Sequence, residues 1–374
     1  MKKQILIATG LAVLSTSAFA SKARLEALGQ NDDRGSFYVE DARNIFRNAS
    51  KVNTHKNYIT TEWGTANDAA DSKTTPHAEG GFFREMGSFN YGVYLGSEID
   101  SQNASRVNIV TDDTIKDSGE YNFLKHDNAL DLFFGGDMGV QWGARLHYAS
   151  AKDESAAVSQ EHDNFGLGLG MMMGDIEAYA NMTLSDESKG NVFQDSTGAA
   201  GDKLEGNSLN VGVAYNLMGS KLYADYDKAG YESTIAGAKT EYTETTMTVG
   251  VGRIHEVSST ARLNMDIAYV SGKEETKTTS TVEAKETFIP LTLGFEADAN
   301  SWLVLRGAIT QNVLLNTDKD NAGKKTTKAN TTTVTSGATL NFGKLKVDGS
   351  IGTGTAGTLQ LDNLMTRVGV SYWF

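Results

Sequence analysis

The sequence of 374 residues contains no cysteine, only 2 prolines and no run of about 18 consecutive apolar residues. Without cysteine the chain forms no disulfide, binds no metal through thiolates and has no cysteine nucleophile. Without a long apolar run it is not a helical-bundle membrane protein. The near absence of proline agrees with a sheet that has no free edge, because proline donates no ladder hydrogen bond.

Positive charge is also scarce. The chain has 34 Lys and Arg against 47 Asp and Glu, and its formal net charge is −13. A nucleic-acid partner is therefore not expected, since such binding needs basic surface to neutralise phosphates. The mean hydropathy of −0.35 is that of a hydrophilic chain.

Residues 1–20 have the order of an export signal. Lys2 and Lys3 precede a short apolar stretch, and Ala18-Phe19-Ala20 ends it with small residues at the cleavage positions. The apolar stretch is too short to be a membrane anchor. We predict a signal peptide removed after Ala20, which leaves an exported chain with a formal charge of −15.

From about Gly87 onward, apolar residues alternate with polar or small ones, as in half-exposed strands. Leu263, Met265 and Ile267, for example, alternate with Asn264 and Asp266. Fourteen such segments are predicted: 87–97, 128–137, 140–150, 163–173, 176–185, 207–217, 221–229, 242–253, 261–271, 286–296, 302–312, 331–341, 345–353 and 361–374.

The predicted connections alternate between short turns and long polar loops. The long loops are 98–127, 151–162, 186–206, 272–285 and 313–330. Short turns on one rim, long loops on the other and an even strand number are typical of a transmembrane barrel. A sandwich of fourteen strands would need two domains, and no boundary is visible. We therefore predict an all-β fold, a transmembrane antiparallel β-barrel of about 14 strands, with 12–16 allowed.

The final strand strengthens this prediction. Val368, Val370, Tyr372 and Phe374 place apolar residues at alternate positions up to a C-terminal aromatic residue. With the export signal and the alternating segments, this pattern resembles the Gram-negative outer-membrane β-barrel porin class. The resemblance covers about residues 80–374. It implies that these four residues are an assembly signal read by the barrel-assembly machinery, and that the protein lies in the outer membrane, in contact with lipid and lipopolysaccharide.

Residues opposite the apolar faces should line the lumen. Opposed rows of arginine and carboxylate would set a transverse field that screens solutes. The alternative is that the same charges form salt-bridged networks that fill the barrel. The pore-lining candidates are Arg145, Glu177, Asp225, Arg262, Asp266, Arg306, Lys346 and Arg367.

Residues 21–80 do not continue the strand series and are predicted to form an N-terminal plug or a periplasmic segment before a barrel at 81–374. Short helices are expected over 22–29 and 39–49, and a strand over 57–63. If that strand joins the barrel, sixteen strands become possible. The mixture of charges in this segment suits a polar lumen, which favours partial plugging over a periplasmic tail.

The sequence shows no catalytic, metal-binding or cofactor-binding pattern. Most of its histidines fall in predicted loops, without the spacing of paired metal ligands. They are His55, His77, His126, His147, His162 and His255. We therefore predict a protein without enzyme activity, a porin for passive diffusion of small hydrophilic solutes and ions. Two alternatives stay open, a transporter of hydrophobic ligands with an N-terminal hatch, and a surface-interaction barrel with a blocked lumen.

Overall fold

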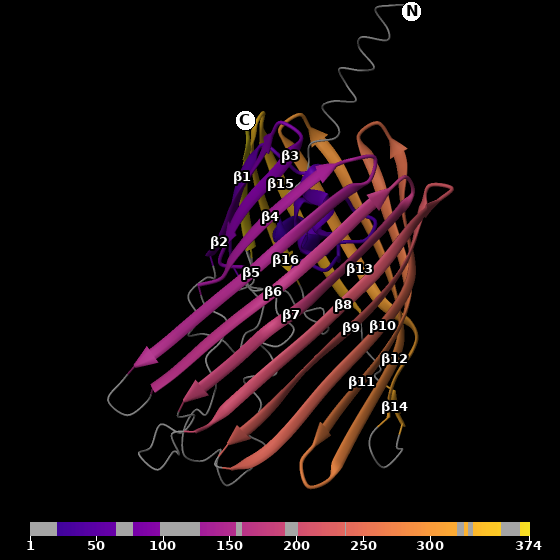
Figure 1. Cartoon of the computed structure of the whole chain (residues 1–374). Helices are drawn as coiled ribbons and strands as arrows, with labels where there is room; N and C mark the ends of the chain where they lie inside the picture. Colours follow the sequence, from indigo (N-terminus) through magenta and orange to yellow (C-terminus); the bar gives the residue numbers. More distant parts are fainter. Residues whose placement is uncertain are drawn as a thin grey trace, which may run out of the picture.

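The computed structural model describes residues 21–64, 78–97, 128–154, 159–190, 201–235, 237–319, 325–327, 332–352 and 367–374. The predicted signal peptide and the predicted loop 98–127 lie outside these residues. Figure 1 shows a tilted barrel of strands that surrounds a few short helical turns. The strands are β1 (Tyr58–Gly64), β2 (Ala78–Met86), β3 (Phe89–Leu95), β4 (Leu130–Asp137), β5 (Gln141–Glu154), β6 (Ser159–Met173), β7 (Ile176–Gly190), β8 (Lys203–Leu217), β9 (Ser220–Ile235), β10 (Ala238–Ser258), β11 (Ala261–Lys277), β12 (Thr281–Asn300), β13 (Leu303–Lys319), β14 (Lys325–Thr327), β15 (Thr333–Phe342), β16 (Leu345–Gly352) and β17 (Arg367–Trp373).

The sheet closes on itself. Each long strand pairs antiparallel with the next along the chain, and β1 pairs with both β2 and β17. The three-residue β14 pairs with the end of β13, whose remaining length pairs with β15. Of the 17 strands in the described residues, sixteen therefore surround the lumen, and the prediction of about fourteen was too low. All fourteen predicted segments overlap strands, and β1 and β2 complete the set.

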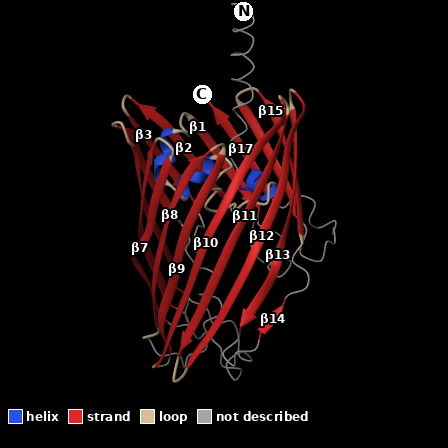
Figure 2. Ribbon diagram, turned by 90° about the vertical axis from the view of Figure 1, so that its right-hand side faces the viewer, coloured by secondary structure: helices blue, strands red, loops and turns tan. Residues whose placement is uncertain are grey.

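The outer face of the sheet is apolar and the inner face is polar, as the alternation predicts. On β11, the outward Leu263 and Ile267 are exposed, whereas Asn264 of the same strand is buried inside. A closed barrel satisfies every backbone ladder and can place apolar side chains outside and polar ones inside. In the side view of Figure 2 the strands form a continuous wall around the helices.

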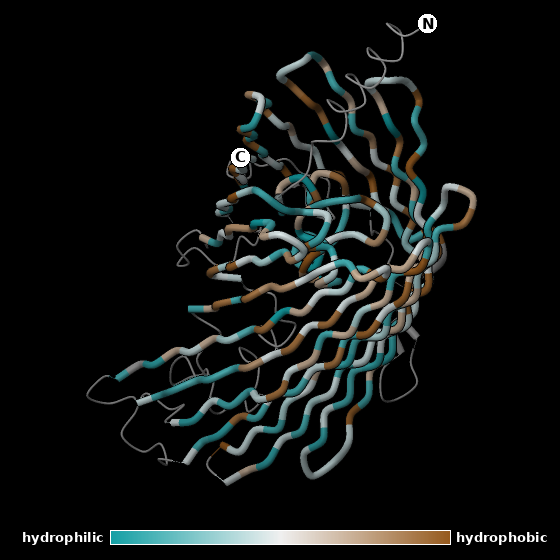
Figure 3. Tube along the Cα trace, turned by 45° about the horizontal axis from the view of Figure 1, so that its top comes forward, coloured by the Kyte–Doolittle hydropathy of each residue, from teal (hydrophilic) through white to brown (hydrophobic). Residues whose placement is uncertain are grey.

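The long strands extend into four of the five predicted long loops. Strands β7 to β12 have 15 to 21 residues, whereas a tilted strand needs about 9–11 residues to cross a bilayer. Beyond the apolar part the outward positions carry ion pairs, such as Lys273 with Glu275 and Glu283. Figure 3 shows that the strand ends far from the C-terminus are hydrophilic. Backbone pairing continues where both faces are wet, so strands extend through residues 151–154, 159–162, 186–190, 203–206, 272–277 and 281–285, which were predicted as loops.

Residues 21–57, called the inner segment here, fold inside the barrel in its half nearest the C-terminus (Figures 1 and 2). The segment contains the α-helix α2 (Lys22–Ala27) and the 3-10 helices η1 (Ala42–Phe46) and η2 (Ala49–Asn53). The single helix expected over 39–49 is thus two short ones, because Asn48 caps a new turn by accepting from the Ser50 N–H. The barrel itself begins at Tyr58 rather than at residue 81.

Candidate functional site: the lumen and the inner segment

The inner segment packs against a part of the wall where glycines replace larger residues. Gly143 of β5 and Gly170 of β6 face η2, and a β-carbon added at either would overlap the backbone or side chains of residues 48–50. Gly135 of β4 has the same relation to Val52. Only glycine allows backbones to approach this closely. The wall is therefore shaped to receive this segment in one position.

An apolar cluster fills the gap beside this contact. Ile45, Phe46 and Val52 of the inner segment pack on Phe83 and Phe133 of the wall, and all five side chains are buried. Burial of each large apolar side chain contributes about 1.5–3 kcal/mol. The segment is held as a folded part of the molecule.

A buried carboxylate on β12 pairs with arginines of both the wall and the inner segment. Glu296, 2% exposed, accepts hydrogen bonds from Arg24 of α2, from Arg262 and from Arg306. Arg306 also donates to Asp348. Burial by itself would lower the pKa of Arg24, but Glu296 and Asp41 together raise it above its usual range. Arg262 and Arg306, two of the pore-lining candidates, therefore lie in one network on the same side of the lumen.

Two other wall charges bind the inner segment near β1 and β17. Arg367, a pore-lining candidate, forms ion pairs with Glu26 and Asp32. Glu79 of β2 forms ion pairs with Lys22 and Arg43. Together with the Glu296 network, these contacts attach the segment around α2 and η1.

A further chain of charges joins η2 to the opposite wall. Lys51 lies 3.2 Å from Glu40 and 3.2 Å from Glu177, a pore-lining candidate on β7. Glu177 also pairs with Lys221 of β9. His55 Nε2 lies 2.9 Å from Glu40. Burial would raise the pKa of Glu40, yet the hydrogen bond to His55 and the charge of Lys51 hold it well below its usual range.

Aromatic rings extend the contact on β7 and β9. Phe37 of the inner segment stacks on Tyr223 of β9 with ring centroids 4.1 Å apart. The guanidinium of Arg47, also in the inner segment, lies 3.9 Å from the centroid of the Phe37 ring. Tyr223 donates to Asp266, and Tyr179 donates to Asp225. The two aspartates, both pore-lining candidates, are thus bonded to neighbouring wall tyrosines.

The remaining two candidates lie apart from each other. Arg145 of β5 donates to the buried Asp131 and lies 5.0 Å from the Phe46 centroid. The Lys346 ammonium lies 5.1 Å from the Trp373 ring. The eight candidates are therefore spread around the lumen, mostly in ion pairs or hydrogen bonds.

Three of the six histidines are buried beside carboxylates. His55 contacts Glu40, His147 contacts Asp131, and His162 contacts Asp186. His147 lies in a segment predicted as a strand, whereas the strand position of His162 was hidden because the ends of the long strands lack apolar alternation. Within the described ranges, no group of three or more potential ligands could hold a metal ion. No helix in the described ranges is long and apolar enough to cross a membrane.

The sequence did not reveal Glu296 as a centre of the site. Its position on the same face of β12 as Thr292 and Gly294 was available from the alternation, but its three arginine partners come from different parts of the chain. The buried Glu79 was hidden too, because β2 places two phenylalanines next to each other and breaks the apolar alternation.

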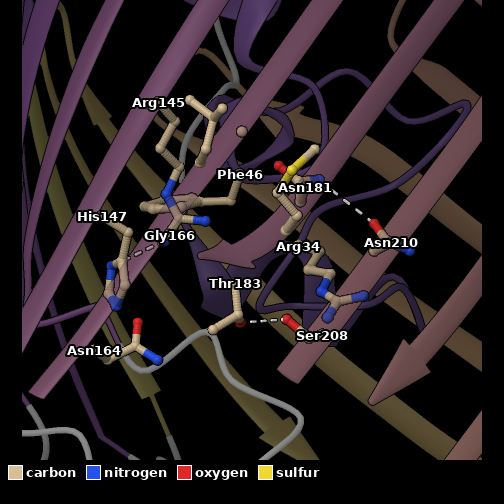
Figure 4. Close-up of a pocket in the computed structure, with 13 residues that line it drawn as sticks. Arg34, Phe46, Arg145, His147, Asn164, Gly166, Asn181, Thr183, Ser208 and Asn210 are labelled. Carbon is tan, nitrogen blue, oxygen red and sulfur yellow. Dashed lines mark hydrogen bonds between the residues drawn. The ribbon is translucent and has the colours of Figure 1, made fainter. Parts of the chain in front are cut away.

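Two of the hollows between the inner segment and the wall share a lining residue. The first, called the basic pocket, is lined by Arg34 and Phe46 of the inner segment and by strands β5 to β8. Figure 4 shows Arg145, His147 and Asn164 on one side of it and Arg34, Asn181 and Asn210 on the other. The second, called the acidic cavity, has a volume of about 390 Å³ and lies between residues 31–47 and strands β9 and β10. Arg34 lines both hollows.

Comparison with known proteins adds the following. No family model and no curated protein matches the chain. Among solved structures, the Ralstonia pickettii toluene transporter TbuX is 10% identical, with 95% of this chain and 98% of that chain covered and a TM-score of 0.40. OmpT, an outer membrane protein of Vibrio cholerae, is 11% identical, with 85% and 97% covered and a TM-score of 0.37. The Pseudomonas putida toluene transporter TodX is 11% identical, with 94% of this chain and 96% of that chain covered and a TM-score of 0.36.

The class of protein follows from this chain's own strand pairing and side-chain distribution. It is a closed antiparallel β-barrel whose outer face is apolar, whose lumen is polar and whose N-terminal residues occupy part of that lumen.

Proposed function

We propose that this protein is a Gram-negative outer-membrane barrel that admits small hydrophilic solutes by passive diffusion, and that the inner segment is a plug that controls the passage. One observation carries the proposal: charged side chains of the inner segment are buried in ion pairs with an inward wall that is itself charged. A polar lumen of this kind suits hydrated solutes.

The location in the membrane belongs to the same proposal. Large apolar side chains are exposed along the outer face of many strands, which a bilayer would cover. The chain would reach the outer membrane after export and removal of residues 1–20. The barrel-assembly machinery would then recognise its C-terminal strand through Val368, Val370, Tyr372 and Phe374. Tyr372 and Phe374 are exposed, as a signal read by a partner requires.

The test measures ion conductance in planar bilayers and keeps all sixteen strands. Deletion of residues 21–80 would remove β1 and the start of β2, so substitution is the better tool. Gly143→Ala combined with Gly170→Ala should displace η2, because each added methyl overlaps the inner segment. Gly166→Ala is the matched control on the same strand as Gly170, since its β-carbon would meet nothing nearer than 3.4 Å.

We expect the double variant to conduct several-fold more than the parent chain and the Gly166→Ala control. Equal conductance of all three would show that the inner segment does not control passage. Silence of all three, with uptake of an apolar probe into liposomes, would favour the hydrophobic-ligand transporter instead.

A further inference from the structure

The basic pocket differs in charge from the rest of the lumen. Arg34, Arg145 and His147 line it, and none of its thirteen lining residues is Asp or Glu. The carboxylate that pairs with Arg145 and His147 is Asp131, which lies buried behind the pocket with no exposed surface. The guanidinium groups of Arg34 and Arg145 can donate to an anion in the pocket, whereas the amide N–H groups of Asn181 and Asn210 already donate to Arg47 and Asp225.

Amides and hydroxyls complete the lining of the basic pocket. Asn164, Asn181 and Asn210 come from three adjacent strands, and Thr183 and Ser208 lie 2.6 Å apart between them. The pocket holds about 60 Å³, room for a few waters at about 10–15 Å³ of cavity volume each. That is room for a carboxylate group but not for a whole solute.

The acidic cavity has the opposite balance. Asp33, Asp225, Asp227 and Glu244 line it against only two cations, Arg34 and Arg47. Its volume of about 390 Å³ falls within the range of about 300–1,000 Å³ in which small molecules bind. Phe37, which lies between Tyr223 and Arg47, also lines it. This cavity can hold the body of a small solute and its cationic group.

One ion pair stands where the two hollows meet. Arg34 of the inner segment donates to Asp227 of β9, and Arg34 belongs to both linings. A guanidinium has five N–H donors and a carboxylate has about four acceptor sites, so each partner can bind a second group. A solute that carries both charges could thus add its carboxylate to Arg34 and its ammonium to Asp227 while their own contact persists.

We propose that the two hollows form one binding site for a small zwitterion with separated carboxylate and ammonium groups, of the size of an amino acid or dipeptide. The carboxylate enters the basic pocket, and the ammonium faces Asp227 and Glu244 in the acidic cavity. This proposal rests on the proposed function, because it names the class of solute that would bind in the lumen beside the plug.

The test compares three peptides of nearly equal size on the full mature protein in detergent. The probes are L-alanyl-L-alanine, its N-acetyl derivative, which lacks the ammonium, and its C-terminal amide, which lacks the carboxylate. Titration calorimetry should show that the zwitterion binds at least tenfold tighter than either blocked peptide. Binding of either blocked peptide within threefold of the zwitterion would overturn the proposal.

Variants assign the two charges to the two hollows. Arg34→Gln should weaken binding of the zwitterion at least tenfold. Arg253→Gln, which removes the same charge from the exposed outer face of β10, should change nothing. Glu244→Gln should weaken the zwitterion and the amide but not the N-acetyl peptide. If Arg34→Gln and Arg253→Gln bind the zwitterion equally well, the site is not where we place it.

Binding is measured at equilibrium and needs no ion current. Selective binding without conductance in any variant would therefore refute the proposed function and leave the site intact. Conductance on plug displacement without selective binding would refute the site alone.

Discussion

At the scale of single residues, the interior depends on charges that are buried in pairs. Arg24 and Arg306 contact Glu296 where all three side chains are almost completely buried. Removal of one partner from such a group leaves buried charges without full compensation, which costs more than the ion pair contributes. The position of the inner segment is therefore sensitive to the loss of a wall carboxylate such as Glu296.

Glu296→Gln should destabilise the folded barrel by about 3–5 kcal/mol, because three guanidinium groups lose their shared carboxylate. Urea unfolding in detergent, followed by the mobility shift of the folded barrel on electrophoresis, measures the change. Glu283→Gln is the matched control, since Glu283 pairs with Lys273 and Lys285 on the outer face with about a third of its side chain exposed. That control should change stability by less than about 1 kcal/mol. Similar effects of both substitutions would show that the Glu296 network adds nothing beyond a surface pair.

Glu40 should make the stability of the folded protein fall at acid pH. Its pKa in the folded protein is held below the ordinary value of about 4.3 by His55 and Lys51, against the effect of burial. Stability from this group is thus present above about pH 4.3 and is lost as the pH falls below it. The stability difference between the parent chain and Glu40→Gln should shrink as pH falls from 6 to 3.

Taking the difference between the two proteins removes the influence of other groups, such as Asp41, whose pKa is raised by burial and which therefore acts in the opposite sense. The control is Glu85→Gln at the exposed rim, where Glu85 pairs with Lys56. A constant difference between parent and Glu40→Gln across this pH range would show that Glu40 is not held ionised by its neighbours.

At the scale of the elements, β12 shows how the sheet tolerates a residue that the alternation disfavours. Pro290 lies inside this strand, where its missing N–H would interrupt a regular ladder. The pairing of β12 with β13 shifts register at Ile289 and Pro290, and the ladder between β12 and β11 skips both residues. A bulge therefore accommodates the proline, as it does elsewhere in sheets.

Pro290→Ala should leave the barrel folded, because the bulge does not use the N–H that the substitution restores. Leu293→Pro, three residues further along in the regular ladder opposite Met265 and Ile309, should prevent assembly, because proline there removes a ladder hydrogen bond in the middle of the sheet. The fraction of heat-modifiable, folded protein after refolding distinguishes the two. Equal yields would mean that the bulge has no role in accommodating the proline.

At the scale of the whole molecule, the barrel is apolar outside and charged within. The outward Val249 of β10 is 57% exposed, whereas Asn264 and Glu296 inside are each 2% exposed. This distribution suits a bilayer outside and water inside. It also divides each long strand into an apolar part and a charged end.

Val249→Arg should destabilise the refolded barrel in lipid by about 2–4 kcal/mol, the cost of placing a charge on the lipid face near the bilayer centre. Thr243→Arg adds the same side chain on the same face of β10, six residues nearer the charged end, where the cost should fall to about 0–1 kcal/mol. Urea titration in liposomes measures both. Equal costs would show that the apolar part of β10 does not lie within the bilayer.

The sequence by itself predicted what depends on local repetition. The two-residue alternation identified the barrel, fourteen of its strands and the inward face of Asp225, Arg306 and their neighbours, because side-chain direction in a strand repeats every two residues. It overlooked β2 and treated the ends of the long strands as loops, since alternation of polarity disappears where both faces are wet. Backbone pairing, which needs no apolar side chain, continues there.

Only the tertiary structure decided how the lumen is filled. Sixteen strands rather than fourteen became evident when β1 closed the sheet between β2 and β17, a contact across more than 300 residues of sequence. The partners of Glu296, the glycines under η2 and the meeting of two oppositely charged hollows at Arg34 likewise depend on register and on the fold of residues 21–57. Such contacts join residues that are distant in sequence, and a local pattern carries no information about which of them meet.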